Sequence, residues 1–351
     1  MTRGAGTAEF YVSRGRFVVR ALPYARMILT TSDPICIARD PAPLATEWSE
    51  LARHRARPTI FLTPEWLAVA RAHDRRAQIT LSVLGGRGIA ALACDDDGTL
   101  GFAGGELTDE QDVIARAADV APVAAALGHW IAAQHVTRIR MDFVPEESGM
   151  AEPLGEALRG ARYEVAVDRL VTSPRLSIPD TFEAYVRHLG KKERHELRRK
   201  MRRLETGRRV EFRFADARDR AAVLDRFIAL HRRSRGEKAE FMTESMERYF
   251  RDVADATARR DWLRLGVLDV DGDDVAVLFG FAYEGTLALY NAAYDPAFAS
   301  LSVGIVAHAY AIRAAVEEHM HTYDLLRGDE PYKYDLGGED HWLLRIEATA
   351  P

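Results

Sequence analysis

A strand followed by a polar turn and a helix is the most informative stretch for chemistry. The strand expected at Thr286–Ala293 carries Tyr290 and Asn291 near its end, and Asp295-Pro296 then makes a turn. A helix is expected from Ser302 to Met320. Because the first N–H groups of a helix lack partners and the helix dipole is positive there, this start could bind a pyrophosphate. The residues concerned are Leu301, Ser302, Val303 and Gly304.

The same residues also fit a plainer interpretation, in which Ser302 caps an ordinary helix and Gly304 serves packing. No Gly-Lys-Ser/Thr follows, so this is not a P-loop. Gly304 stands alone, so it is not a dinucleotide-binding fingerprint either. Both interpretations stay open at this point.

A second cluster of reactive side chains follows the short strand expected at Thr322–Leu326. Polar loops at strand ends are places where functional residues collect. The alternative is structural: Asp324 and Arg327 could form a local salt bridge, and the tyrosines could edge the core. The loop offers Asp324, Arg327, Asp329, Glu330, Tyr332, Lys333 and Tyr334.

The segment 187–209 concentrates positive charge in a chain whose net charge is only −5. It holds eleven Lys/Arg and three acids, a balance of +8, while the remainder has 37 basic and 50 acidic residues, a balance of −13. A solvated face would be the ordinary explanation, but interleaved acids are too few to relieve the repulsion. We therefore expect an anionic partner. The segment has no aromatic residue to stack bases, which argues against single-stranded nucleic acid.

Several other classes of site are excluded. His308 and His319 are about three helical turns apart, too far for one metal ion, so no metal cofactor is expected. No Gly-x-Ser-x-Gly elbow is present to anchor a hydrolase triad. Cys36 and Cys94 are too few for a disulfide framework or a four-ligand zinc site.

Length and composition indicate an ordinary globular protein of about two domains. The 351 residues are 47% hydrophobic and 29% charged. The sequence has no long uncharged apolar stretch, so we expect no membrane span. The first thirty residues lack the apolar core of a signal peptide. The expected location is the cytoplasm.

The expected elements form a mixed α/β pattern in each half, consistent with a duplicated fold divided near residues 170–180. Gly85-Gly86 predicts a hairpin between strands at Ala77–Leu84 and Gly88–Cys94. Thr181 is expected to cap a helix that continues through the basic segment to Gly207. The other main expectations are a helix at Asp109–Gln134, a strand at Val136–Phe143, a helix at Arg218–Arg235, a helix at Ser245–Arg259, and three strands at Leu263–Val270, Val275–Tyr283 and Thr286–Ala293.

The second half resembles the CelD-like acetyltransferases, which are GNAT-fold proteins related to the Fem peptidyltransferases. The resemblance lies in Tyr290–Pro296 with Ser302-Val303-Gly304, in Tyr323–Lys333, in the basic stretch Leu189–Lys200 and, more loosely, in Phe61–Trp66. It implies an α/β (α+β) fold of tandem GNAT-like lobes, each a mixed, mostly antiparallel sheet flanked by helices. Residues 1–175 would form a degenerate first lobe with acceptor binding as its candidate role, and 176–351 the acyltransferase lobe.

The resemblance implies acyl transfer from a thioester, normally acyl-CoA, to an amine of a small molecule or peptide. The donor pyrophosphate would lie on Leu301, Ser302, Val303 and Gly304, although this loop keeps only one glycine of the usual pattern. An ammonium must lose a proton before it attacks, so we expect Asp324 or Glu330 as base and Tyr290 as proton donor to the thiolate. The expected substrate contacts are Asn291, Arg327, Tyr332 and Lys333.

Three rivals remain. A Fem-like aminoacyl-tRNA-dependent ligase would use the basic segment for tRNA, but a pI near 6.2 disfavours it. Fatty-acyl transfer from an acyl-carrier protein to a peptide amine would match that segment with an acidic partner. The third rival is a protein that binds an acyl donor without turnover. DNA is not an expected partner.

Overall fold

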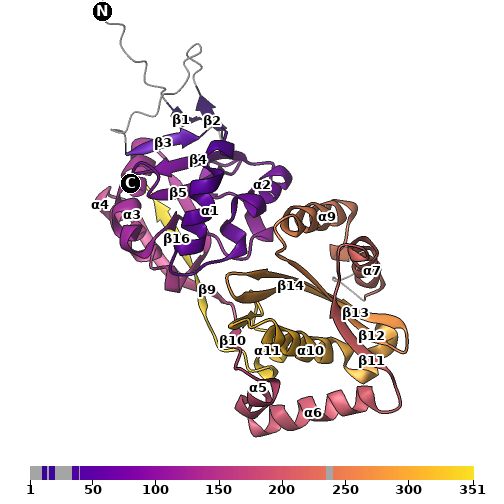
Figure 1. Cartoon of the computed structure of the whole chain (residues 1–351). Coiled ribbons are helices and arrows are strands. Elements are labelled where there is room, and N and C mark those ends of the chain that lie inside the picture. The colour runs from indigo at the N-terminus through magenta and orange to yellow at the C-terminus, as the bar shows by residue number, and fades with distance from the viewer. Residues whose placement is uncertain (1–9, 14–15, 20–33, 39, 235–239) are drawn as a thin grey trace, which may run out of the picture. The chain divides into compact units, whose positions relative to one another are not determined.

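The computed structural model describes residues 10–13, 16–19, 34–38, 40–234 and 240–351. The chain forms two compact units. The first comprises the described residues up to Val171 together with Trp342–Pro351, and the second is Thr172–His341 (Figure 1). The division lies close to the expected boundary near 175. The last ten residues, however, belong to the first unit because they form a strand of its sheet.

The second unit is built on one six-stranded sheet. Every neighbouring pair is antiparallel except β14 and β15, which run parallel. In spatial order the strands are β10 (Arg175–Ser177), β15 (Thr322–Asp324), β14 (Thr286–Tyr294), β13 (Asp273–Tyr283), β12 (Leu263–Val270) and β11 (Val210–Phe214).

Two tight turns set the register of this sheet. Val270 pairs with Asp273 across Asp271-Gly272, and Tyr283 pairs with Thr286 across Glu284-Gly285. All four turn residues have positive φ, from 44° at Glu284 to 97° at Gly272. Two-residue turns of this kind match the natural twist of antiparallel strands. The three strands expected between residues 263 and 293 are thereby confirmed.

Helices cover both faces of the sheet. Phe227 of α7 and Phe250 of α9 pack on Phe279, which points to one face. Leu278 belongs to the opposite core, together with residues of α6 and α10. The helices are α5 (Phe182–His188), α6 (Lys191–Glu205), α7 (Arg220–Arg233), α9 (Glu244–Ala258), α10 (Val303–Glu317) and α11 (Pro331–Asp335), with the 3-10 helix η6 at Pro296–Leu301.

The basic segment is two helices, not the single helix expected from its periodicity. Thr181 caps α5 through its side chain, as expected, but Leu189 and Gly190 have extended backbone and α6 begins at Lys191. Glycine is a poor helix former. The Glu193 side chain lies over Gly190 so closely that a Cβ there would be 2.3 Å from its carboxylate oxygen. The predicted apolar stripe of Leu197, Met201 and Leu204 is buried.

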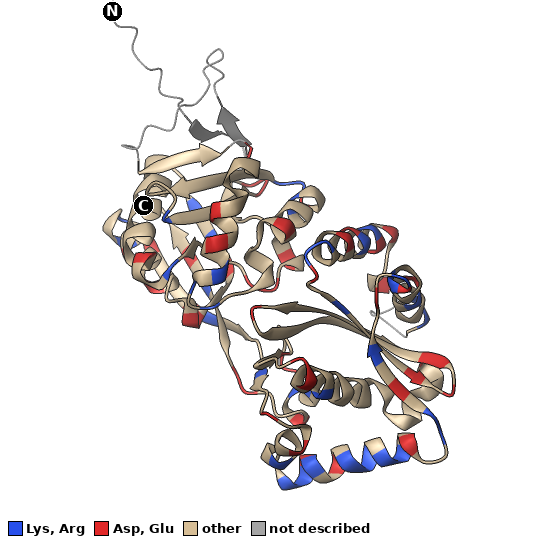
Figure 2. Cartoon of the chain, viewed as in Figure 1, with Lys and Arg blue, Asp and Glu red and all other residues tan. Residues whose placement is uncertain are grey.

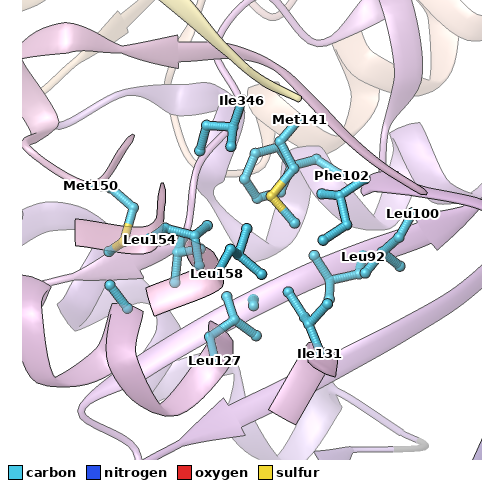
Figure 3. Packing of buried hydrophobic residues seen from close by; sticks show 14 of the residues in the cluster. Leu92, Leu100, Phe102, Leu127, Ile131, Met141, Met150, Leu154, Leu158 and Ile346 are labelled. Carbon is cyan, nitrogen blue, oxygen red and sulfur yellow. The ribbon is translucent and has the colours of Figure 1, made fainter. Parts of the chain in front are cut away.

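The first unit contains a larger mixed sheet, whose core is shown in Figure 3. The predicted Gly85-Gly86 hairpin is confirmed, with Val83 opposite Gly88. A separate two-stranded sheet pairs β1 (Phe10–Ser13) with β2 (Arg16–Val19). The main strands in order are β3 (Ile35–Ala38), β4 (Ala77–Val83), β5 (Gly88–Cys94), β6 (Thr99–Phe102), β8 (Arg138–Pro145), β16 (Trp342–Thr349) and β9 (Glu164–Thr172), and β7 (Ile114–Ala115) pairs with β5. The helices are α1 (Ala45–His54), α2 (Pro64–His73), α3 (Val120–Ala133) and α4 (Ala151–Gly160).

The two units repeat one order of elements. Each has a strand, two helices, three antiparallel strands, a crossover helix and a strand parallel to the one before that helix. In the first unit α3 links the parallel pair β6 and β8, and in the second α10 links β14 and β15. The predicted fold class, two lobes that each hold a mixed sheet flanked by helices, is confirmed.

The helix expected at Asp109–Gln134 is wrong in its first third. Only Val120–Ala133 is α-helical, and residues 103–119 form a loop, β7 and short 3-10 turns. The reason is burial of charge: Asp112 pairs with Arg55, and Glu110 pairs with Arg57 at 2.9 Å, with both carboxylates inside the unit. These tertiary ion pairs outweigh the local helix propensity of the segment.

We predict that Ile346→Ala destabilises the first unit by about 2–5 kcal/mol, because it leaves a cavity between β16 and the core. Ile346 is fully buried in the core cluster, although it lies near the chain end. Urea denaturation followed by circular dichroism measures the loss. Glu347→Ala, at the exposed neighbouring position, should change stability by no more than about 0.5 kcal/mol. Equal effects of the two variants would contradict this account of β16.

Candidate active site

At Tyr290 strand β14 no longer pairs with β15 and carries a bulge in its pairing with β13. The parallel pairing with β15 ends at Ala288 opposite Asp324. On the other side the register with β13 jumps from Gly280–Leu289 to Phe279–Asn291, so Tyr290 is the extra residue of a β-bulge. A bulge leaves backbone groups outside the ladder. The bulged backbone can therefore offer hydrogen bonds to a substrate carbonyl.

The side chain of Tyr290 lies among aromatic rings of α9 and β13. Its ring centroid is 5.8 Å from those of Phe250 and Phe281, and its hydroxyl lies 3.4 Å from the Tyr249 hydroxyl. The ring is half-buried. A phenol held by packing in this way has a defined position beside the bulge, which suits the predicted role as a proton donor.

Asn291 is tied to a buried histidine that sequence reasoning missed. Its Oδ1 lies 2.7 Å from His231 Nε2 and accepts the N–H of Ala292 at 2.8 Å. Since an amide oxygen only accepts, the hydrogen bond implies a proton on Nε2 of His231. His231 lies on α7, sixty residues away in sequence, and no spacing pattern connects it with β14. The predicted substrate contact of Asn291 stays a prediction.

The start of α10 is not capped by the side chain of Ser302, and the predicted anion site there stays a prediction. Ser302 has left-handed backbone (φ 57°) and makes no side-chain cap. Its Oγ accepts a hydrogen bond of 2.8 Å from Arg203 Nη2 of α6. Val303 is buried, whereas Leu301, Ser302 and Gly304 are half-exposed, with Gly304 beside the Tyr294 ring.

The basic helix thus meets the predicted donor site inside the same unit. Besides the Arg203–Ser302 bond, Glu205 accepts a hydrogen bond of 2.6 Å from the Tyr310 hydroxyl of α10. These two contacts hold the C-terminal end of α6 along α10. A guanidinium and the positive end of a 15-residue helix therefore lie together, and both attract an anion.

Asp324 and Lys333 organise the loop after β15. Asp324 is fully buried, accepts the Leu326 N–H at 2.9 Å and lies 4.0 Å from Arg175 Nε. Lys333 is 2% exposed, and its ammonium donates to the carbonyl oxygens of Leu326, Arg327 and Gly328 at 2.9, 2.6 and 3.2 Å. An ammonium has three protons. Lys333 therefore holds the loop together, and its predicted contact with an anionic substrate stays a prediction.

The remaining predicted residues lie around this loop. Glu330 is exposed and pairs with Lys333 at 3.0 Å, and Arg327 is half-buried. Tyr332 packs on His308, whose Nδ1 is 3.0 Å from the hydroxyl of the fully buried Tyr323. Burial raises the pKa of the Tyr332 hydroxyl, so this phenol stays protonated near neutral pH.

Comparison with known proteins finds a family match in the second unit. Residues 191–334 match the family model described as acetyltransferase (GNAT) domain. The matched region lies wholly within the second unit. The match includes α6, β14, the start of α10 and the loop of Lys333. The narrower assignment to CelD-like acetyltransferases stays a prediction, and a search of curated protein sequences finds no match.

Solved structures share the fold across both units. A conserved protein from Bacteroides thetaiotaomicron VPI-5482 has a TM-score of 0.63 at 14% identity, covering 90% of this chain and 99% of that one. FemX has a TM-score of 0.61 at 11% identity, covering 86% and 95%. The C-terminal domain of a putative lysylphosphatidylglycerol synthetase from Agrobacterium fabrum has a TM-score of 0.57 at 10% identity, covering 87% of this chain and 91% of that one. At these identities the likeness shows the fold alone.

The first unit differs from the GNAT domain at the position of the bulge. There β5 pairs with β6 and then with β7, so residues 103–113 form a loop where β14 has a single extra residue. That loop carries the buried ion pairs of Asp112 with Arg55 and Glu110 with Arg57. Beside the start of α3, Asp119 pairs with Arg87. The first unit therefore has an eleven-residue excursion at the position where β14 has one bulged residue.

The described part of the chain contains no group of three or more His, Cys, Asp or Glu side chains arranged to hold a metal ion. None of the helices in that part has the length and apolar character needed to cross a bilayer.

We predict that Lys333→Met destabilises the GNAT domain by about 3 kcal/mol or more, because it leaves three inward-facing carbonyls without a donor. Chemical denaturation gives the loss, and limited proteolysis reports whether residues 326–333 loosen. Glu330→Gln removes only the exposed partner of the lysine and should cost no more than about 1 kcal/mol. If Lys333→Met were as stable as Glu330→Gln, the loop-holding role would be wrong.

Proposed function

We propose that the protein is an N-acyltransferase that moves an acyl group from acyl-CoA to an amine of a small molecule or peptide. The observation that carries the proposal is the Arg203–Ser302 contact at the start of α10 within a matched GNAT domain. It combines a guanidinium, a serine hydroxyl and free helix N–H groups at the position where the family holds the donor pyrophosphate. Arginine is well suited to phosphate because its planar fork donates several hydrogen bonds.

The proposed reaction needs one base, one oxyanion site and one proton donor. The neutral amine nitrogen attacks the thioester carbon, the N–C bond forms, the C–S bond breaks, and the products are an amide and a thiol. The bulged backbone at Tyr290 would hold the oxyanion, and the Tyr290 hydroxyl would protonate the departing thiolate. Of the two proposed bases, Glu330 is exposed, whereas Asp324 is enclosed beside Arg175. The proposal therefore favours Glu330 as the group that takes the amine proton.

The proposal assigns the donor to the second lobe and leaves the first lobe without a donor site. Support comes from the 103–113 loop, which follows β6 and is held by buried ion pairs. Removing a partner from a buried ion pair is costly, so this loop is not readily displaced. The first lobe is then available to bind the acceptor amine, which is the role predicted for residues 1–175.

A Fem-like aminoacyl-tRNA-dependent ligase is the second candidate. The fold likeness to FemX and the basic face of α6 favour it, whereas the acidic remainder of the chain disfavours it. The two candidates differ in donor, so donor binding separates them.

We predict that acetyl-CoA or a longer acyl-CoA raises the melting temperature. A hundredfold excess over the dissociation constant corresponds to about 2.7 kcal/mol of stabilisation. Arg203→Ala should weaken CoA-ester binding about 10- to 100-fold, because it removes a charged hydrogen-bond donor from the phosphate position. Arg208→Ala, an exposed arginine beyond the end of α6, should leave the affinity unchanged. The absence of a shift with any CoA ester, together with salt-sensitive tRNA binding, would replace the proposal with the ligase.

We predict that Tyr290→Phe lowers kcat about 100-fold or more while the donor affinity stays the same, since only the proton donor is lost. Release of the CoA thiol from acyl-CoA in the presence of a panel of primary amines measures the rate. Tyr334→Phe removes an exposed hydroxyl that bonds to Asp340 and serves as the matched control. Unchanged turnover in Tyr290→Phe would remove Tyr290 from the mechanism.

A further inference from the structure

Lys and Arg are concentrated along α6 (Figure 2), and their exposed positions give the helix a positive outward face. Residues spaced by three and four positions share one side of a helix. Two adjacent stripes of this kind run along α6 away from its buried side. The first is Lys191, His195, Arg198 and Arg202, and the second is Lys192, Arg199 and Arg203, and all of these residues are exposed.

The acids of α6 neutralise only one cation of this face, Arg199. Glu193 lies over Gly190, Glu196 pairs with Arg199 at 2.7 Å, and Glu205 accepts the hydroxyl of Tyr310. Among the residues that the structure describes, Lys191, Lys192, Arg198 and Arg202 have no carboxylate partner. Like charges at this spacing destabilise an isolated helix. The chain tolerates that repulsion on a helix that its apolar stripe anchors to the core.

The positive face extends well beyond the predicted pyrophosphate position. Arg203 at one end contacts Ser302, and Lys191 lies twelve residues away, about 18 Å along the helix. Lys191, Lys192, His195 and Arg198 are exposed at that far end. A phosphate group bound at the α10 start would engage only the Arg203 end. The other cations need an anionic partner with an extended surface.

We propose that α6 docks an acidic carrier protein, which presents the acyl group as a thioester on its phosphopantetheine arm. This inference rests on the proposed function and adds a protein-bound form of the same thioester donor. The phosphodiester of the arm would lie at Ser302 and Arg203, and carboxylates of the carrier surface would meet the Lys191–Arg202 stripe. Attack and departure of the thiol are unchanged, because the arm ends in the same thioester.

Two observations favour an acidic protein over RNA. No aromatic side chain lies on α6, so bases have no stacking partner. The remainder of the chain is strongly acidic, which repels an extended polyanion that reaches beyond α6. A small acidic protein can confine its contact to one helix face.

The test measures binding of the acyl carrier protein of a bacterial fatty-acid synthase in its apo form, which lacks the arm. Fluorescence anisotropy at low and physiological salt should show salt-sensitive binding to the unmodified protein. The double variant Lys191→Glu/Arg198→Glu should bind at least about tenfold more weakly. The control Arg248→Glu/Arg259→Glu reverses two exposed charges on and just after α9, and it should bind like the unmodified protein.

CoA-ester stabilisation is measured on the same three proteins and keeps the two proposals separate. Unchanged stabilisation in Lys191→Glu/Arg198→Glu shows that its donor site and fold are intact. Failure of all three proteins to respond to CoA esters would count against the proposed function, while apo-carrier binding still tests the surface. The docking proposal is overturned if the apo carrier does not bind, or if both double variants weaken it equally. It is also overturned if total tRNA binds more tightly than the carrier, and if Lys191→Glu/Arg198→Glu loses that tRNA binding while the control variant keeps it.

Discussion

The parallel pairing of β14 with β15 is the constraint from which the candidate site follows. Two parallel neighbours need a crossover, and α10 is that crossover. The crossover helix α10 begins after the C-terminal end of β14. The pairing of β14 with β15 also stops toward that end, after Ala288 and Asp324. The end of the β14–β15 pairing, the bulge at Tyr290 and the start of α10 therefore lie toward the same end of these strands. No side-chain chemistry is needed to explain why they coincide.

The same topology occurs twice in the chain with different results. Both units contain the parallel pair and the crossover helix. In the second unit the strand continues past one bulged residue, whereas in the first unit an eleven-residue excursion interrupts it and carries the ion pairs Arg55–Asp112 and Arg57–Glu110. Buried ion pairs hold a loop in one arrangement but are weak evidence for high stability. The two units therefore differ in loop length at one position of a shared fold.

The basic helix α6 carries much of the positive charge that the small net charge of the chain conceals. Its apolar residues Leu197, Met201 and Leu204 belong to the core of the second unit, which leaves the cationic faces outward. At the C-terminal end of α6, the Arg203–Ser302 hydrogen bond places a guanidinium beside the start of α10. The helix dipole of α10 alone would attract an anion only weakly. At the N-terminal end of α6 the charges stay exposed. One amphipathic helix therefore packs on the core with one side and exposes its cations on the other.

The sequence by itself determined the elements whose signals are local. Asp-Gly and Glu-Gly turns, the Thr181 cap, the 3.6-residue stripe of α6 and the glycine hairpin of β4 and β5 each arise from a few neighbouring residues, and the structure has all of them. It also placed the loop and helix start that the GNAT domain match includes. Tertiary structure alone decided the break at Gly190, the loop at residues 109–119 and the return of β16 to the first unit. It also decided the contacts of His231 with Asn291, Arg203 with Ser302 and Lys333 with three carbonyls. The physical reason is range: local rules act over about four residues, whereas ion pairs, ladders and side-chain hydrogen bonds join positions that only the folded chain brings together.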